Sequence, residues 1–81
     1  MCINVRLFAI IRDKAGMDSF TVELPDGATV ADARDQIESR YPATREHMQR
    51  AAFAVNQNYV AISTRLKDGD ELAVIPPVSG G

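Results

Sequence analysis

Several features that define other protein classes are scarce in this sequence. Cys2 is the single cysteine, so no internal disulfide can form, and we expect a reducing, cytoplasmic compartment. No apolar run approaches the roughly 20 residues that span a bilayer, and polar Asn4 and Arg6 interrupt the apolar start where a signal peptide would be unbroken. Nine basic residues against eleven acidic ones do not cluster into a stripe that could neutralise phosphates. We therefore expect neither a membrane nor a nucleic acid as a partner.

Conventional catalytic groups are also scarce. His47 is the only histidine and is interpreted as a solvated surface residue, while Cys2 is interpreted as a partly exposed bystander without a neighbour that would activate its thiol. Acidic residues gather at 68–71, but this spacing is typical of an Asp- and Gly-rich turn and not of a calcium loop. We predict no metal site. With 81 residues, the chain has one modest core, which favours a module that acts through partners over a self-contained enzyme.

The first part of the chain has the alternation of a two-stranded unit. Apolar residues at every second position over 3–9 predict a strand with one buried face, and the same alternation returns over 20–24. Charged residues and a glycine at 12–16 predict a turn between the two strands. These segments together predict a β-hairpin.

A helix is predicted next, followed by further strands. Thr29 with Asp32 resembles a capping box, the apolar spacing from Val30 to Tyr41 is helical, and Pro42 ends the helix. Residues 43–50 are left open between a short helix and an ordered loop. Three short strands are expected at 53–56, 59–62 and 71–75, the first two joined near residues 57–58 and the last preceded by a turn at 67–70.

This order of elements predicts an α+β fold. A helix between strands allows the first and last strands to lie parallel and central, so we expect a mixed sheet of about five strands with one main helix packed on one face. That architecture is a β-grasp domain, expected to cover residues 1–75. Residues 76–81 are expected to form an extended C-terminal tail.

The tail is the most unusual segment. Its residues are Pro76, Pro77, Val78, Ser79, Gly80 and Gly81. Six extended residues reach about 20 Å, the two prolines stiffen the exit from the fold, and the final glycines lack a Cβ that would block a narrow channel. A frayed terminus is the alternative interpretation. If the tail functions, its terminal carboxylate is the reactive group, and it must be activated, for example by adenylation, before sulfur or a lysine amine can attack it.

Several of these residues resemble a known family, the small sulfur-carrier subunit of molybdopterin synthase. The similar segments are 54–57, Leu66 with 68–71, and 75–81, together with Phe8, Ala9, Arg12 and Gly16 near the start. The ending Pro-Pro-Val-Ser-Gly-Gly is the most specific of them, because the related thiazole-synthesis carrier usually lacks the two prolines. The resemblance covers most of the chain except residues 41–52.

The resemblance implies a fold and a function. The fold would be ubiquitin-like, and Gly81 would be adenylated by a ubiquitin-activating-like enzyme that consumes ATP. A sulfur-donating protein would then allow conversion to a thiocarboxylate, which would donate sulfur to a cyclic pyranopterin precursor in molybdenum cofactor biosynthesis. The catalytic residues would lie on the large synthase subunit, so this chain would be no enzyme on its own and would bind no cofactor stably.

The resemblance also implies contacts. Phe8, Tyr59 and Ile75 occupy positions where apolar residues of the family meet the large subunit, although many relatives have an aromatic residue in place of Ile75. Arg12 matches an arginine that is expected to contact the activating enzyme. Alternation agrees for Phe8, which falls on the face opposite the buried residues of its strand. The alternatives are a β-grasp carrier for thiazole or amino acid synthesis, a ubiquitin-like protein modifier, and an interaction domain with an inert tail.

Overall fold

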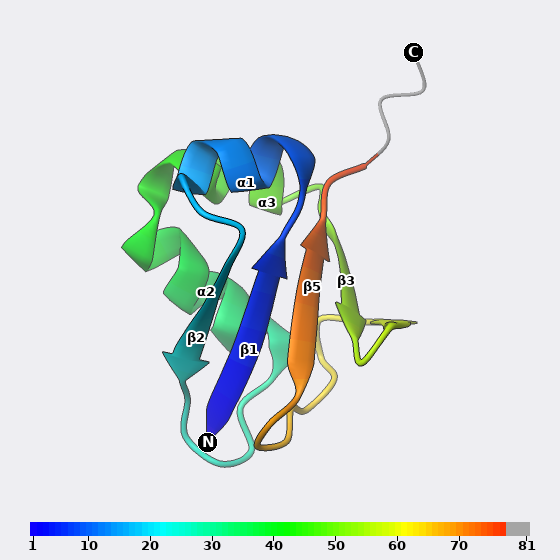
Figure 1. The fold of residues 1–81 in the computed structure, drawn as a ribbon. Coiled ribbons are helices and arrows are strands. Elements are labelled where there is room, and N and C mark those ends of the chain that lie inside the picture. The colour runs from blue at the N-terminus through cyan, green and yellow to red at the C-terminus, as the bar shows by residue number, and fades with distance from the viewer. Residues whose placement is uncertain (78–81) are drawn as a thin grey trace.

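A computed structural model describes residues 1–77, which form a five-stranded mixed sheet with helices beside it (Figure 1). The elements are β1 (Cys2–Leu7), α1 (Ala9–Ala15), β2 (Ser19–Glu23), α2 (Val30–Arg40), the short 3-10 helix η1 (Pro42–Thr44), α3 (Arg45–Met48), β3 (Ala52–Val55), β4 (Asn58–Val60) and β5 (Glu71–Ile75). The strand order is β2-β1-β5-β3-β4, and only the central pair β1 and β5 is parallel within this sheet. The expected parallel arrangement of the first and last strands is therefore confirmed.

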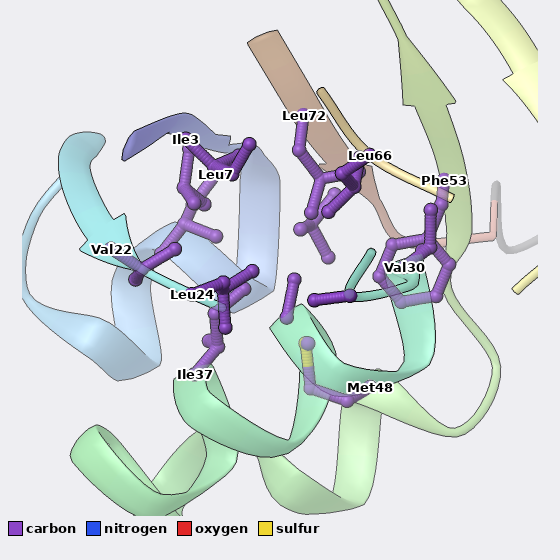
Figure 2. Close-up of a cluster of buried hydrophobic side chains, with 14 of the residues drawn as sticks. Ile3, Leu7, Val22, Leu24, Val30, Ile37, Met48, Phe53, Leu66 and Leu72 are labelled. Carbon is purple, nitrogen blue, oxygen red and sulfur yellow. The ribbon is translucent and has the colours of Figure 1, made fainter. Parts of the chain in front are cut away.

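The hydrophobic core lies between the sheet and α2. Ile3, Val5 and Leu7 point from β1 toward this side, and Ile37 is fully buried on the facing stripe of α2. Figure 2 shows the side chains of Ile3, Leu7 and Ile37 meeting between the helix and the strands. The remaining members of the core are Ile11, Val22, Leu24, Ala28, Val30, Ala33, Met48, Phe53, Leu66, Leu72 and Val74. The predicted alternation of the strands and the helical spacing thus select the same core.

The start of α2 is fixed by its own residues and by a distant segment. The Thr29 N–H donates to Asp32 Oδ2 at 2.8 Å and the Asp32 N–H donates to Thr29 Oγ1 at 3.3 Å, which is the predicted capping box. The first helical N–H groups are satisfied from further along the chain, since Val30 donates to the carbonyl of Thr64 and Ala31 to that of Ile62, each at 2.9 Å. This explains why β4 ends at Val60, earlier than predicted.

The predicted hairpin over residues 3–24 is wrong in its connection. A seven-residue helix, α1, stands between β1 and β2, so Ala9 begins a helix instead of continuing the strand and residues 12–15 belong to that helix. The helix buries Ile11 and ends at Gly16, whose φ of 79° is the left-handed conformation typical of a glycine that follows a helix. The two strands still pair antiparallel, as predicted.

The other connections are close to the predictions. The segment 43–50, left open between a short helix and an ordered loop, is helical in its first part, where η1 ends at Thr44 and α3 covers Arg45–Met48. The turn between β3 and β4 consists of Asn56 and Gln57, with φ of 50° and 74°, one residue before the predicted position. Asparagine is among the residues that tolerate this conformation best. Among residues 1–77 no helix is long and apolar enough to cross a membrane.

Candidate functional site

The chain leaves the fold at the end of β5, beside the start of α1. Because β1 and β5 run parallel with Leu7 opposite Val74, both strands finish at the same edge of the sheet, where Phe8 and Ile75 follow. Figure 1 shows β5 ending next to α1 and α3, at the opposite end of the sheet from the N-terminus. Pro76 is half-buried and Pro77 is exposed. The predicted tail residues Val78, Ser79, Gly80 and Gly81 lie outside the described residues.

The face of the sheet opposite α2 carries three of the predicted partner-binding residues. The cross-strand partners Arg6, Ala73, Ala54 and Tyr59 form one row across four strands, because paired residues share a face of the sheet. In the next row Ile75 lies opposite Ala52, and Phe8 follows Arg6 at the end of β1. We call Phe8, Ala52, Ala54, Tyr59, Ala73 and Ile75 the open-face patch.

The open-face patch has the composition of a binding surface. Tyr59 is 72% exposed, Phe8 and Ile75 are half-buried, and of the alanines Ala52 is exposed, Ala73 half-buried and Ala54 buried. Phe8 takes an extended conformation, φ −129° and ψ 152°, so its side chain continues the alternation of β1 and points away from Leu7. The sequence prediction that Phe8 and Ile75 face away from the core is confirmed.

A groove lies around the root of the tail. It is lined by Phe8, Ala9, Ile10, Glu46, His47, Gln49, Arg50, Ile75, Pro76 and Pro77. His47, expected to be a surface residue, is half-buried and lines this groove. Sequence reasoning missed Ile10 and Arg50, because the groove forms only when α1 and α3 pack together. The signal for α1 was present in Gly16, preceded by Arg12 and Lys14 in the last turn.

Arg12 lies apart from this surface. It is exposed on α1, its Nε is 3.8 Å from Asp13 Oδ1, and it lines a shallow depression with Gly16 and Met17 instead of the groove. The structure thus brings Phe8, Tyr59 and Ile75 onto one face and leaves Arg12 outside it.

The carboxylates of the 67–70 turn have structural roles. Asp68 Oδ1 accepts from the Cys2 N–H at 2.7 Å, and Asp70 accepts from the Lys67 N–H at 2.8 Å and from Asn56 Nδ2 at 2.9 Å. These bonds tie the turn to β1 and to the β3–β4 turn. Within residues 1–77, no three His, Cys, Asp or Glu side chains are grouped so that they could hold a metal ion. Residues 1–77 thus present a partly exposed sheet face beside the root of the tail.

Comparison with known proteins assigns the family. Residues 5–81 match the sequence profile of the ThiS family. The chain belongs to the ThiS family. It is 47% identical to the molybdopterin synthase sulfur carrier subunit of Chlamydomonas reinhardtii, and the match covers 100% of both chains. The resemblance to the small subunits of molybdopterin synthase is therefore confirmed.

Solved structures of similar proteins agree with the fold. SAMP1, a small archaeal modifier protein, from Haloferax volcanii superposes with a TM-score of 0.92 at 30% identity, over 100% of both chains. Subunits 1 and 2 of the molybdopterin-converting factor of Helicobacter pylori were solved as a complex, and this ThiS-family chain matches that structure with a TM-score of 0.72 at 28% identity, again over 100% of both chains. The predicted ubiquitin-like β-grasp fold, an α+β sheet with one main helix on one face, is confirmed.

Proposed function

We propose that this chain is the sulfur carrier subunit of a molybdopterin synthase and that it carries sulfur as a thiocarboxylate on Gly81. The observation that carries the proposal is the full-length match, at 47% identity, to a subunit of that name. The Pro-Pro-Val-Ser-Gly-Gly ending supports it further. Gly81 lies outside the described residues, so its role follows from its chemistry and from the family.

The proposed chemistry is that of an activated carboxylate. An ionised carboxylate resists nucleophilic attack, so a ubiquitin-activating-like enzyme first transfers AMP from ATP to it and releases pyrophosphate. Sulfur supplied by a sulfur-donating protein then displaces AMP and leaves the thiocarboxylate. The large subunit positions this group against a cyclic pyranopterin precursor, and its own catalytic residues direct sulfur transfer. The small subunit is then the donor in a sulfurtransferase and is no enzyme alone. It holds no cofactor stably, and ATP is used by the activating enzyme.

The tail and the open-face patch then have separate tasks. Phe8, Tyr59 and Ile75 dock on the large subunit, because exposed apolar side chains gathered on one face gain most when a partner covers them. The domain of residues 1–75 is held by this contact, and the tail of residues 76–81 enters the active site. Its reach of about 20 Å fits this division. Arg12, on another surface, contacts the activating enzyme, and we place these steps in the cytoplasm.

The experiment that tests the carrier mechanism changes only the end of the tail. Two variants, one lacking Gly81 and one with a single residue added after it, are expressed beside the unchanged chain in cells that make molybdenum cofactor. Intact-mass analysis of the unchanged chain should show replacement of one oxygen by sulfur in the C-terminal peptide. Both variants should show no such replacement, with unchanged circular dichroism. Sulfur loading of either variant would refute the mechanism.

A protein modifier is the second candidate, and one observation favours it. The superposition with SAMP1, a small archaeal modifier protein, has a TM-score of 0.92. A modifier would use the same adenylated Gly81 but would end on a lysine amine as an isopeptide. The same cells distinguish the two functions, because a modifier gives a ladder of high-mass conjugates that retain the chain, whereas a carrier gives the sulfur-exchanged chain alone.

A further inference from the structure

Arg6 is a charged residue within the open-face side of the sheet. It lies on β1, the strand next to the centre of the sheet, opposite Ser19 of β2 and Ala73 of β5. Its guanidinium carbon stands 5.5 Å from the centre of the Phe8 ring. Arg6 therefore touches one member of the open-face patch and pairs with another.

Arg6 has no ion-pair partner among residues 1–77. In the described part Arg12, Arg34 and Arg45 lie within 4.0 Å of a carboxylate, whereas Arg40, Arg50 and Arg65, like Arg6, do not. Arg6 differs from these three in its contact with Phe8 on the open face. Glu71 lies on the same face as Arg6 but one row away, opposite Asn4, and no oxygen of Glu71 comes within 4.0 Å of the Arg6 nitrogens. The charge of Arg6 is thus balanced by solvent in the free chain.

The charged side chains of the neighbouring groove do not supply Arg6 with an ion-pair partner. Glu46, His47 and Arg50 line the groove on the side of α3, and among the described residues Glu46 forms no ion pair with Arg6. Phe8 belongs both to the groove, which it lines, and to the open-face patch, where its ring contacts the Arg6 guanidinium. A partner that covers Phe8 must therefore deal with Arg6 as well.

A partner that covers Arg6 must compensate the cost of removing water from its charge, and this requirement restricts the chemistry of the partner's surface. A surface that contacts both Phe8 and Ala73 also removes water from the guanidinium between them. Burying a charge without a partner is strongly unfavourable, whereas a paired and hydrogen-bonded charge is tolerated. Besides its contact with the Phe8 ring, the Arg6 side chain donates no hydrogen bond within residues 1–77. Its N–H groups therefore remain available, and a guanidinium matches a carboxylate in two parallel hydrogen bonds.

We propose that the large synthase subunit places a carboxylate opposite Arg6, and that this ion pair helps to select the cognate large subunit. The inference rests on the proposed function, because it assigns the chemistry of the surface that receives the open-face patch. It runs against the overall charge of the chain, which is −2 and on its own would favour a basic partner. The local arginine reverses that preference at the centre of the contact, and such charge matching gives specificity more than affinity.

Three variants of the full chain test the proposal. Arg6→Gln removes the charge and keeps a polar side chain of similar reach, and Arg6→Glu places like charges opposite each other. Arg65→Glu is the matched control, because Arg65 is exposed beside the start of α2, opposite Thr29, and its reversal changes the net charge by the same amount as Arg6→Glu. Thermal unfolding of each variant establishes that it is folded, and calorimetry measures its affinity for the large subunit at low and high salt.

We expect Arg6→Gln to weaken binding about tenfold at low salt, because the partner's carboxylate is left buried and unpaired. Arg6→Glu should weaken binding by more than about 30-fold and Arg65→Glu by less than about twofold. Added salt should weaken the wild-type complex and narrow the gap to Arg6→Gln. Wild-type affinity for Arg6→Gln, or equal effects of Arg6→Glu and Arg65→Glu, would overturn the proposal.

A fourth variant separates this inference from the proposed function. Phe8→Asp should weaken docking about 100-fold if the open-face patch binds the large subunit at all. If Phe8→Asp weakens binding and Arg6→Gln does not, the docking stands and the carboxylate is refuted. If the unchanged chain fails to bind the large subunit, the proposed function itself is refuted.

Discussion

The two faces of the sheet differ in what covers them. On one face the side chains of Ile3, Val5 and Leu7 pack against α2 and are almost completely buried. On the other face Phe8 is half-buried and Tyr59 is exposed. Within residues 1–77, Figure 1 shows no helix lying across that face of the sheet. Leu7 and Phe8 are neighbours in the chain, yet they belong to different faces.

This difference teaches that stability and binding can be changed separately in this protein. Side chains between the sheet and α2 contribute to the free energy of unfolding, and those of the open face remain available to a partner. A small domain has only about 5–15 kcal/mol of stability, so a partner site on the covered face would put the fold at risk. Substitutions at the adjacent residues Leu7 and Phe8 therefore test most directly whether stability and binding are separate.

Leu7→Asp should have the largest effect on the fold. Leu7 is 2% exposed, and an aspartate there would bury a carboxylate with no basic partner in the core. We expect a loss of more than about 4 kcal/mol, which is most of the stability of such a domain. Urea unfolding followed by circular dichroism measures it. Leu7→Met is the control and should cost less than about 1.5 kcal/mol. A wild-type unfolding midpoint for Leu7→Asp would contradict the assignment of this face to the core.

Phe8→Asp should weaken docking strongly and change the stability of the fold little. Because Phe8 is half-buried at the edge of the open-face patch, we expect its unfolding free energy to change by less than about 1 kcal/mol. Affinity for the large subunit should fall about 100-fold, the range expected when an aromatic residue that contributes strongly to an interface is replaced. Calorimetry measures this affinity, and Lys14→Asp on the exposed side of α1 serves as the control with a change below about twofold. Equal affinities of Phe8→Asp and the unchanged chain would rule out the patch.

Much of this division could be predicted from the sequence, because period-two alternation reports directly which side chains share a face. The alternation from Ile3 to Leu7 placed Phe8 opposite the core, and the spacing of Val30 and Ile37 identified the covering helix. These signals are local, and the pairing of the first and last strands follows from the order of elements alone.

The helix α1 and the groove could not be predicted in the same way. The position of Ile11 fits both the two-residue period of a strand, because it continues the alternation of β1, and the period of a helix, because it lies four residues after Leu7. The pattern of apolar residues therefore does not distinguish a strand from a helix there. The strand gives way to the helix at Ala9, where φ is 51°, a backbone conformation that the alternation of side chains does not reveal. The groove around Pro76 and Pro77 depends on how α1 packs against α3, which is a tertiary contact between separate segments.

Thr29→Ala should reduce stability without affecting docking. The variant loses the hydroxyl that accepts from the Asp32 N–H at 3.3 Å, so one helical donor of α2 is left to solvent. We expect a loss of about 1 kcal/mol in urea unfolding, and unchanged affinity for the large subunit, since Thr29 lies at the start of the covering helix. Thr29→Ser retains the hydroxyl and should restore most of the stability. A loss of affinity in Thr29→Ala would show that the covered face also influences docking.

Gly16→Ala tests the link between α1 and the groove. Gly16 has a φ of 79°, and nothing lies within 4 Å of where a Cβ would stand, so the cost is backbone strain alone. We expect a loss of about 1 kcal/mol, measured by thermal unfolding. Ala9→Gly is the paired control, because removing a Cβ at φ 51° relieves similar strain and should not destabilise the chain to that extent. If Gly16→Ala also weakens docking, α1 takes part in the contact through the groove. Stability and binding could then not be changed separately at α1.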